Sequence, residues 1–149
     1  MLLKLRERMG REEGFTLVEL LVVMLILGLL AAIAIPSFFN QRDKAKDADA
    51  KAGVRTAQTA IESYATDNGG SYLGATALDL EEIETTLVDV NLQDPTALAD
   101  DAYTVTVIAE DTENEFSITR ASTGDVSYTC VLGAPNKQAG CPTGGNWGE

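Results

Sequence analysis

Apolar side chains are concentrated in one long run near the N-terminus. From Leu20 to Phe39 the sequence holds 20 consecutive uncharged residues, most of them Leu, Val, Ile or Ala. A helix of 20 residues is about 30 Å long, which matches the hydrocarbon thickness of a bilayer. So long and pure a run is rare as a buried core helix in a chain of this size. The pattern therefore predicts an apolar helix at 15–39 that contacts lipid or other copies of itself.

The charges before this run indicate its orientation. Residues 1–14 hold four bases and three acids, and they favour a cytoplasmic N-terminus with the following chain outside. An ordinary secretory signal peptide, cut at a small-residue site within Ala31–Ala34, is the alternative. The apolar run is longer than the ~7–15 residues of a typical signal-peptide core, and it continues into an Ala-rich segment without a break. Both points favour an anchor.

The helical pattern continues as an amphipathic segment at 40–68, which is rich in Ala and has one Gly and no Pro. One face is predicted to pack on a C-terminal domain, and its members are Ala50, Val54, Ala57, Ile61, Tyr64 and Ala65. Asn68-Gly69-Gly70 then ends the helix. A helix over 15–68 would have 54 residues and be roughly 80 Å long. About half of it therefore needs partners other than a small domain.

The remaining segment, 69–149, is predicted to be a small acidic β domain. Its connector contains a short helix over Asp79–Leu87, with Asp79 as the N-cap. Alternating β-branched and polar residues then predict three antiparallel strands, at Tyr103–Ala109, Glu115–Arg120 and Ser127–Leu132. One face of this sheet is expected to pack on the apolar face of the long helix, so the predicted fold class is α+β.

Composition excludes several functions. The 149 residues include 11 Lys+Arg, 23 Asp+Glu and no His, for a net charge of −12. Without histidine, neither a Ser-His-Asp triad nor a His-ligated zinc site can form. The acidic excess disfavours direct nucleic-acid binding, which needs clustered Lys and Arg. Acidic groups at 81–84 and 111–115 lack the spacing of a calcium loop and are interpreted as solvated loops. We therefore predict no enzyme, no cofactor and no metal.

One carboxylate lies at the start of the apolar sequence. Glu19 would stay hydrated at the headgroup level, or it would be paired or functional, since an unpaired charge near lipid is costly. Its surroundings favour a function, because Gly14-Phe15-Thr16-Leu17-Val18-Glu19 resembles the prepilin signature of the type IV pilin superfamily. The resemblance is strong over 14–68 and looser beyond.

This resemblance implies the type IV pilin fold, in which the second half of a long N-terminal helix packs on a small antiparallel sheet. It also implies that a prepilin peptidase removes the leader 1–14 by cutting after Gly14, and then N-methylates Phe15. The new Phe15 amine would neutralise the Glu19 carboxylate of a neighbouring subunit, where an unpaired charge would cost several kcal/mol. Glu19 is thereby assigned to assembly.

Four further residues receive roles. Gly28 and Pro36 weaken the helix, and in the family this segment loses helicity inside the filament. Cys130 and Cys141 enclose ten residues and can oxidise after export, which would contribute ~2–3 kcal/mol. A C-terminal disulfide loop is a familiar feature of type IV pilins. The Gly-rich tail after Cys141 is expected to be loosely held.

Charge is divided along the chain. Residues 40–55 hold five bases and three acids, whereas 56–149 hold two bases and sixteen acids. Three of the bases lie on a helix face other than the apolar one, namely Lys44, Lys51 and Arg55. They form either a solvated face or contacts with the acidic domain of a neighbouring subunit.

Together these observations predict a structural subunit of a type IV pilus. Before assembly it would be a single-pass protein of the bacterial cytoplasmic membrane with its N-terminus inside, and afterwards part of an extracellular filament. The expected partners are membrane lipid, the prepilin peptidase, the pilus assembly machinery and other copies of the chain. Adhesion, twitching motility or DNA uptake would be properties of the filament. A pseudopilin of a type II secretion or competence system, and a signal-anchored extracellular binding domain, are the alternatives.

Overall fold

The computed structural model describes residues 14–133 and 137–148. The predicted leader therefore lies outside the described residues, except for Gly14. The chain divides into two units, Met1–Phe38 and Phe39–Glu149. Helix α2, Leu17–Asp67, begins in the first unit and ends in the second.

Helix α2 begins for a local reason. The Thr16 hydroxyl accepts a hydrogen bond from the Glu19 amide at 3.2 Å, and the Thr16 carbonyl accepts one from the Leu20 amide. Thr-Leu-Val-Glu has the spacing of a capping box, which satisfies backbone amides that a helix start leaves free. The predicted start, Phe15, is therefore two residues early.

The first unit contains the apolar part of α2. Its large apolar side chains are exposed, from Leu17 to Phe38. The helix has an 18-residue window that is apolar enough to cross a membrane by length and composition, and none of that window is buried. Gly28 and Pro36 are both helical here, so the expected weakening of this segment stays a prediction.

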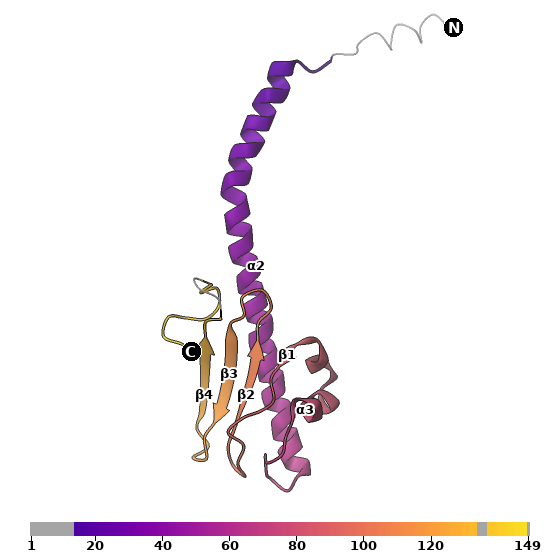
Figure 1. The fold of residues 1–149 in the computed structure, drawn as a ribbon, viewed down its shortest axis with the longest axis vertical. Helices are drawn as coiled ribbons and strands as arrows, with labels where there is room; N and C mark the ends of the chain where they lie inside the picture. The colour runs from indigo at the N-terminus through magenta and orange to yellow at the C-terminus, as the bar shows by residue number, and fades with distance from the viewer. Residues whose placement is uncertain (1–13, 134–136, 149) are drawn as a thin grey trace, which may run out of the picture. The chain divides into compact units, whose positions relative to one another are not determined.

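The second unit is an α+β domain, in which a four-stranded antiparallel sheet packs on the second half of α2 (Figure 1). The strands follow one another in space in chain order, as β1 Asn91–Leu92, β2 Tyr103–Ile108, β3 Glu115–Arg120 and β4 Val126–Val131. The three long strands agree with the prediction to within one residue at each end. Strand β1 was not predicted, because two residues carry no alternation.

The core lies between α2 and the sheet. The predicted face of α2 is buried, with Tyr64 only partly covered, and it includes Gly53 and Ala60 in addition. It meets alternate residues of the strands, namely Tyr103, Val105 and Val107 of β2, Phe116 and Ile118 of β3 and Cys130 of β4. A Cβ on Gly53 would lie 3.3 Å from Val90 Cγ1, so glycine admits the connector close to the helix. The α+β prediction is confirmed.

The connector differs from its prediction. Helix α3 spans Ala77–Ile83, and the 3-10 helix η2 follows at Thr85–Asp89. The N-cap is Thr76 and not Asp79, because Thr76 accepts from the Asp79 amide while the Asp79 carboxylate accepts from the Thr76 amide. The Thr76 hydroxyl also donates to that carboxylate and lowers the pKa of Asp79. Asp79 therefore completes a capping box that Thr76 opens.

Candidate functional site

The predicted processing motif, Gly14–Glu19, extends across the start of α2. Gly14 and Phe15 precede the helix and are exposed, and Phe15 is 78% exposed. A Cβ on Gly14 would meet nothing within 4 Å, so the fold does not require glycine there. The peptide bond between Gly14 and Phe15 therefore lies outside regular secondary structure and is accessible.

Glu19 lies in the first turn of α2 and is exposed. A carboxylate at this position is favoured by the partial positive charge of a helix N-terminus. Since its own amide is capped by Thr16, Glu19 contributes to the helix start as well as bearing the one charge of the apolar sequence. The sequence analysis identified the Glu19 charge but not the hydrogen bond that Thr16 makes at the helix start, although the Thr-x-x-Glu spacing is a known signal for such a cap.

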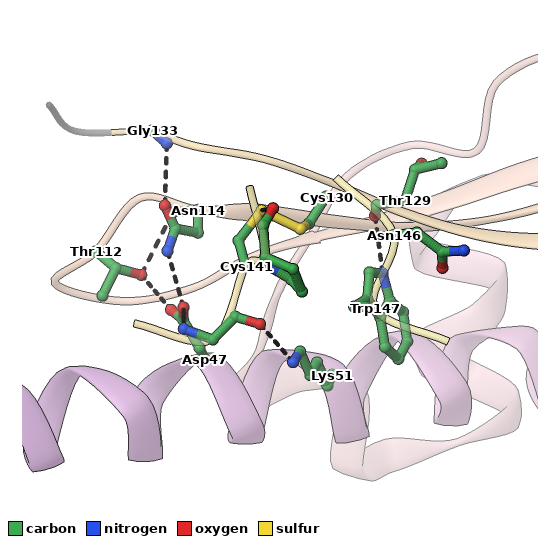
Figure 2. The surroundings of a disulfide bond; sticks show 12 residues. Asp47, Lys51, Thr112, Asn114, Thr129, Cys130, Gly133, Cys141, Asn146 and Trp147 are labelled. Carbon is green, nitrogen blue, oxygen red and sulfur yellow. Dashed lines mark hydrogen bonds between the residues drawn. A yellow bond between two sulfur atoms is a disulfide. The ribbon is translucent and has the colours of Figure 1, made fainter. Parts of the chain in front are cut away.

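The predicted disulfide is present in the second unit, and Figure 2 shows its surroundings. Cys130 on β4 and Cys141 in the C-terminal segment are joined, with a Cα–Cα distance of 5.8 Å. Both are buried, at 6% and 2% exposed, so the bridge belongs to the core.

Beside the disulfide, a buried carboxylate of α2 binds two distant segments (Figure 2). Asp47 is 0% exposed. Its Oδ1 accepts from the Thr112 hydroxyl at 2.5 Å, and its Oδ2 accepts from the Asn114 amide at 2.8 Å and from the Gly140 backbone at 2.7 Å. A Cβ on Gly140 would lie 2.6 Å from Asp47 Cβ, so only glycine allows this approach. Asp47 thereby holds the β2–β3 loop and the C-terminal segment on the helix.

Two of the three predicted surface bases contact their own chain. Lys51 Nζ donates to the Gly140 carbonyl at 2.6 Å and lies 5.2 Å from the centre of the Phe116 ring. Burial lowers the pKa of Lys51. Arg55 is exposed, but its guanidinium lies 5.2 Å from the centre of the Trp147 ring. The expectation that these bases lie away from the packed face is therefore wrong for Lys51, and Lys44 and Arg55 remain exposed.

The tail after Cys141 is packed, contrary to expectation. Trp147 is 6% exposed, and its indole donates to the Thr129 carbonyl at 2.8 Å. Its ring makes edge contacts with Phe116 and Tyr128. Burying one tryptophan removes much apolar area from water, which outweighs the conformational freedom of the Gly-rich segment. Composition alone could not reveal this, because the partners of Trp147 lie on β3 and β4.

A second carboxylate of α2 holds the other part of the sheet. Glu62 accepts from the Tyr72 hydroxyl at 2.7 Å and from the Tyr103 hydroxyl at 2.8 Å, and Arg120 lies 3.5 Å away. Burial, followed by the hydrogen bond to Glu62, raises the pKa of Tyr72 and of Tyr103. Both phenols therefore remain donors well above neutral pH.

The acidic β2–β3 loop pairs with bases of α2. Asp111 lies 2.9 Å from Arg42, and Glu110 lies 2.6 Å from Lys46. The hydrogen bond and the charge of Glu110 raise the pKa of Lys46. No group of three or more His, Cys, Asp or Glu residues suited to a metal ion occurs within 14–133 and 137–148. The contacts that the structure gives the acidic side chains of this loop are the two ion pairs with α2.

Helix α2 thus combines an apolar segment long enough to cross a membrane with the core helix of a small antiparallel α+β domain. The family model described as the prokaryotic N-terminal methylation motif matches residues 9–35. The chain therefore carries the N-methylation motif of type IV pilins, which confirms the resemblance inferred from Gly14–Glu19. Its fold is consistent with the type IV pilin fold.

The N-terminal part of the chain is similar to pilins and to type II secretion proteins. The chain is 44% identical over 54 residues to the type IV major pilin protein PilA of Myxococcus xanthus, covering 36% of this chain and 24% of that protein. It is 40% identical over 58 residues to the type II secretion system core protein G of Pseudomonas aeruginosa, covering 39% and 41%. These matches span less than half of either relative.

A further relative aligns over nearly the whole chain. The type II secretion system core protein G of Vibrio cholerae is 26% identical over 144 residues, which is 95% of each chain. No solved structure matches this chain significantly. The matches support a structural subunit of the pilin type.

Replacing Cys130 and Cys141 together with Ala is expected to lower the free energy of unfolding by about 2–3 kcal/mol, because the unfolded chain regains the freedom of the closed loop. Urea unfolding of the detergent-solubilised full chain measures this. As a control, a reducing agent should destabilise the original protein and leave the double variant unchanged. Equal stability of the two proteins under oxidising conditions would contradict the prediction.

Proposed function

We propose that this chain is the subunit of a type IV pilus, made as a prepilin and polymerised through its apolar helix. The observation that carries the proposal is the methylation motif at the start of a helix whose apolar part is exposed and whose second half is the core of an α+β domain. An exposed apolar segment of this length is stable against lipid or against other copies of itself, because so large an apolar surface is not left in contact with water.

In this proposal, processing creates the assembly contact. Cleavage between Gly14 and Phe15 removes the charged leader and leaves the helix attached. The Phe15 amine, once N-methylated, is a cation beside apolar side chains, and Glu19 of a neighbouring copy is its counter-ion. Because each subunit offers one amine and one carboxylate, the pairing sets how far neighbouring helices are shifted along their axes.

The partners and location follow from this cycle. The prepilin is held in the cytoplasmic membrane with its N-terminus inside and meets the prepilin peptidase there. Assembly machinery of the inner membrane then moves it from lipid into a filament of identical subunits outside the cell. Gly28 and Pro36 lie in the segment that exchanges lipid for protein, where a weakened helix would ease repacking. Lys44 and Arg55 remain candidates for contacts with neighbouring acidic domains.

A pseudopilin of a type II secretion system is the second candidate. The alignment with core protein G of Vibrio cholerae supports it, because it covers 95% of both chains. Cryo-electron microscopy of cells that express this protein separates the two candidates. Long surface fibres that contain the chain support the pilus, and short assemblies confined to the periplasm support the pseudopilus.

The mature N-terminus tests the processing step. We expect mass spectrometry to find a chain that begins at N-methylated Phe15. The Gly14→Val variant should remain uncleaved, because a branched side chain replaces a hydrogen atom next to the peptide bond that is cut. Gly28→Ala is the matched control, since a Cβ there also meets nothing within 4 Å and should leave cleavage unchanged. A chain that begins just after Ala34 would refute the prepilin reading.

A further inference from the structure

The first three bases of α2 after the apolar run, Arg42, Lys44 and Lys46, differ in their contacts. Arg42 is paired with Asp111 and Lys46 with Glu110, at 2.9 and 2.6 Å. Lys44 lies between them in the sequence and is exposed. Among the described residues, 14–133 and 137–148, no hydrogen bond or ion pair engages the Lys44 ammonium. Its charge is thus available to a partner outside the chain.

A second base from the far end of the chain lies beside Lys44. The two line a cavity of about 250 Å³ in the second unit, together with Asn40, Asp43, Gln138 and Ala139. Lys137 is one of two bases in 56–149, which otherwise holds sixteen acids. Its ammonium donates to the Asp111 carbonyl, which is a neutral acceptor, and no carboxylate of the described part of the chain forms an ion pair with it.

The lining of this cavity suits a phosphate group. Two ammonium groups and the side-chain amides of Asn40 and Gln138 offer hydrogen-bond donors, against the single carboxylate of Asp43. The formal charge of the lining is +1, in a chain whose net charge is −12. A ligand with one phosphodiester charge and further hydroxyl donors for Asp43 would match it.

The position of the cavity in the sequence indicates where such a phosphate is found. Asn40 immediately follows Phe39, the last residue of the apolar run. A chain that spans the bilayer with 20–39 places the next turns of its helix at the depth of the lipid headgroups. Basic residues close to a membrane surface attract the headgroups of anionic lipids.

We propose that the cavity between Lys44 and Lys137 binds the phosphodiester headgroup of an anionic phospholipid, and so holds the subunit in the outer leaflet before assembly. The proposal rests on the membrane-anchored state of the proposed function. Lys44 and Lys137 bind the phosphate oxygens, the two amides orient them, and Asp43 accepts from a headgroup hydroxyl. Extraction into the filament breaks these contacts.

The test uses native mass spectrometry of the detergent-solubilised full chain, titrated with phosphatidylglycerol or phosphatidylcholine. We expect preferential binding of phosphatidylglycerol, weakened roughly 10-fold or more by Lys44→Gln with Lys137→Gln. Arg42→Gln with Lys46→Gln is the matched control, because it removes the same charge from the paired bases and should weaken binding less than about 3-fold. Thermal unfolding checks that both variants remain folded.

Three results would overturn the proposal. Equal loss in both double variants would indicate unspecific charge attraction. Inorganic phosphate that competes fully with the lipid would make the cavity a site for free phosphate. Filaments that fall apart in Lys44→Gln with Lys137→Gln, while lipid binding stays normal, would assign the cavity to the acidic domain of a neighbouring copy. Processing at Phe15, measured in the same samples, reports on the proposed function separately, since it does not depend on either lysine.

Discussion

Cells that express the Glu19→Ala variant are expected to make and cleave the subunit but to form at least about 10-fold fewer filaments. Without the carboxylate, the Phe15 amine enters the apolar assembly unpaired, and even 1.4 kcal/mol of this cost per subunit corresponds to a factor of ten. Quantitative immunoblotting of sheared surface filaments, against total and cleaved protein, measures the effect.

Two conservative variants separate charge pairing from helix capping. Glu19→Ala keeps the backbone hydrogen bond from residue 19 to the Thr16 hydroxyl, but it removes a side chain, Glu or Gln, that favours a helix start at this spacing. Glu19→Gln keeps the hydrogen-bonding side chain without the charge and should be as defective as Glu19→Ala. Glu19→Asp keeps the charge and should recover part of the assembly. Normal filament yield from Glu19→Gln would exclude the pairing.

Replacing Asp47 with Ala is expected to lower the free energy of unfolding of the second unit by about 3–5 kcal/mol, because three hydrogen bonds to a buried carboxylate are lost. The substitution leaves the Thr112 hydroxyl, the Asn114 amide and the Gly140 backbone amide without their acceptor in a buried place. The Gly140 segment should then loosen, so the fluorescence of Trp147 should shift toward that of exposed tryptophan. Urea unfolding followed by this fluorescence measures both effects, because Trp147 is the only tryptophan.

Asp49→Ala is the control for this measurement. Asp49 lies two residues further along α2 and is exposed. Its loss therefore removes the same charge without leaving buried donors. It should change stability by less than about 0.5 kcal/mol. Asp47→Asn, which retains one acceptor oxygen, should fall between the two. If Asp47→Ala and Asp49→Ala unfold alike, the buried carboxylate does not hold the C-terminal segment.

Asp47 and Glu62, two carboxylates of the domain half of α2, both hold other segments on the helix. Asp47 binds the β2–β3 loop and the C-terminal segment, while Glu62 binds the phenols of Tyr72 and Tyr103. The apolar face between them is lined largely by Ala, which allows a close helix–sheet contact but offers little shape to specify register. The hydrogen-bonded carboxylates at the two ends of that face supply the directional contacts that the small apolar side chains lack.

Much of the fold could be predicted because its signals are local. The strands at 103–108 and 115–120 alternate with a period of two, and the helix face at 50–65 repeats every three or four residues. Very short elements, and element ends that depend on a cap, were harder to predict from the sequence. Two residues of β1 carry no period, and the start of α3 depends on a reciprocal hydrogen bond between Thr76 and Asp79.

The apolar helix, the methylation motif and the α+β class could be predicted because their signals lie in neighbouring residues. The roles of Asp47, Lys51 and Trp147 became visible in the folded chain alone. The Asp47 partners are 65, 67 and 93 residues away, and the Lys51 partner is 89 residues away. In the sequence these residues have the pattern of surface charges or of a loosely held tail. Their burial and hydrogen bonds depend on segments that are distant in the chain and fold over them.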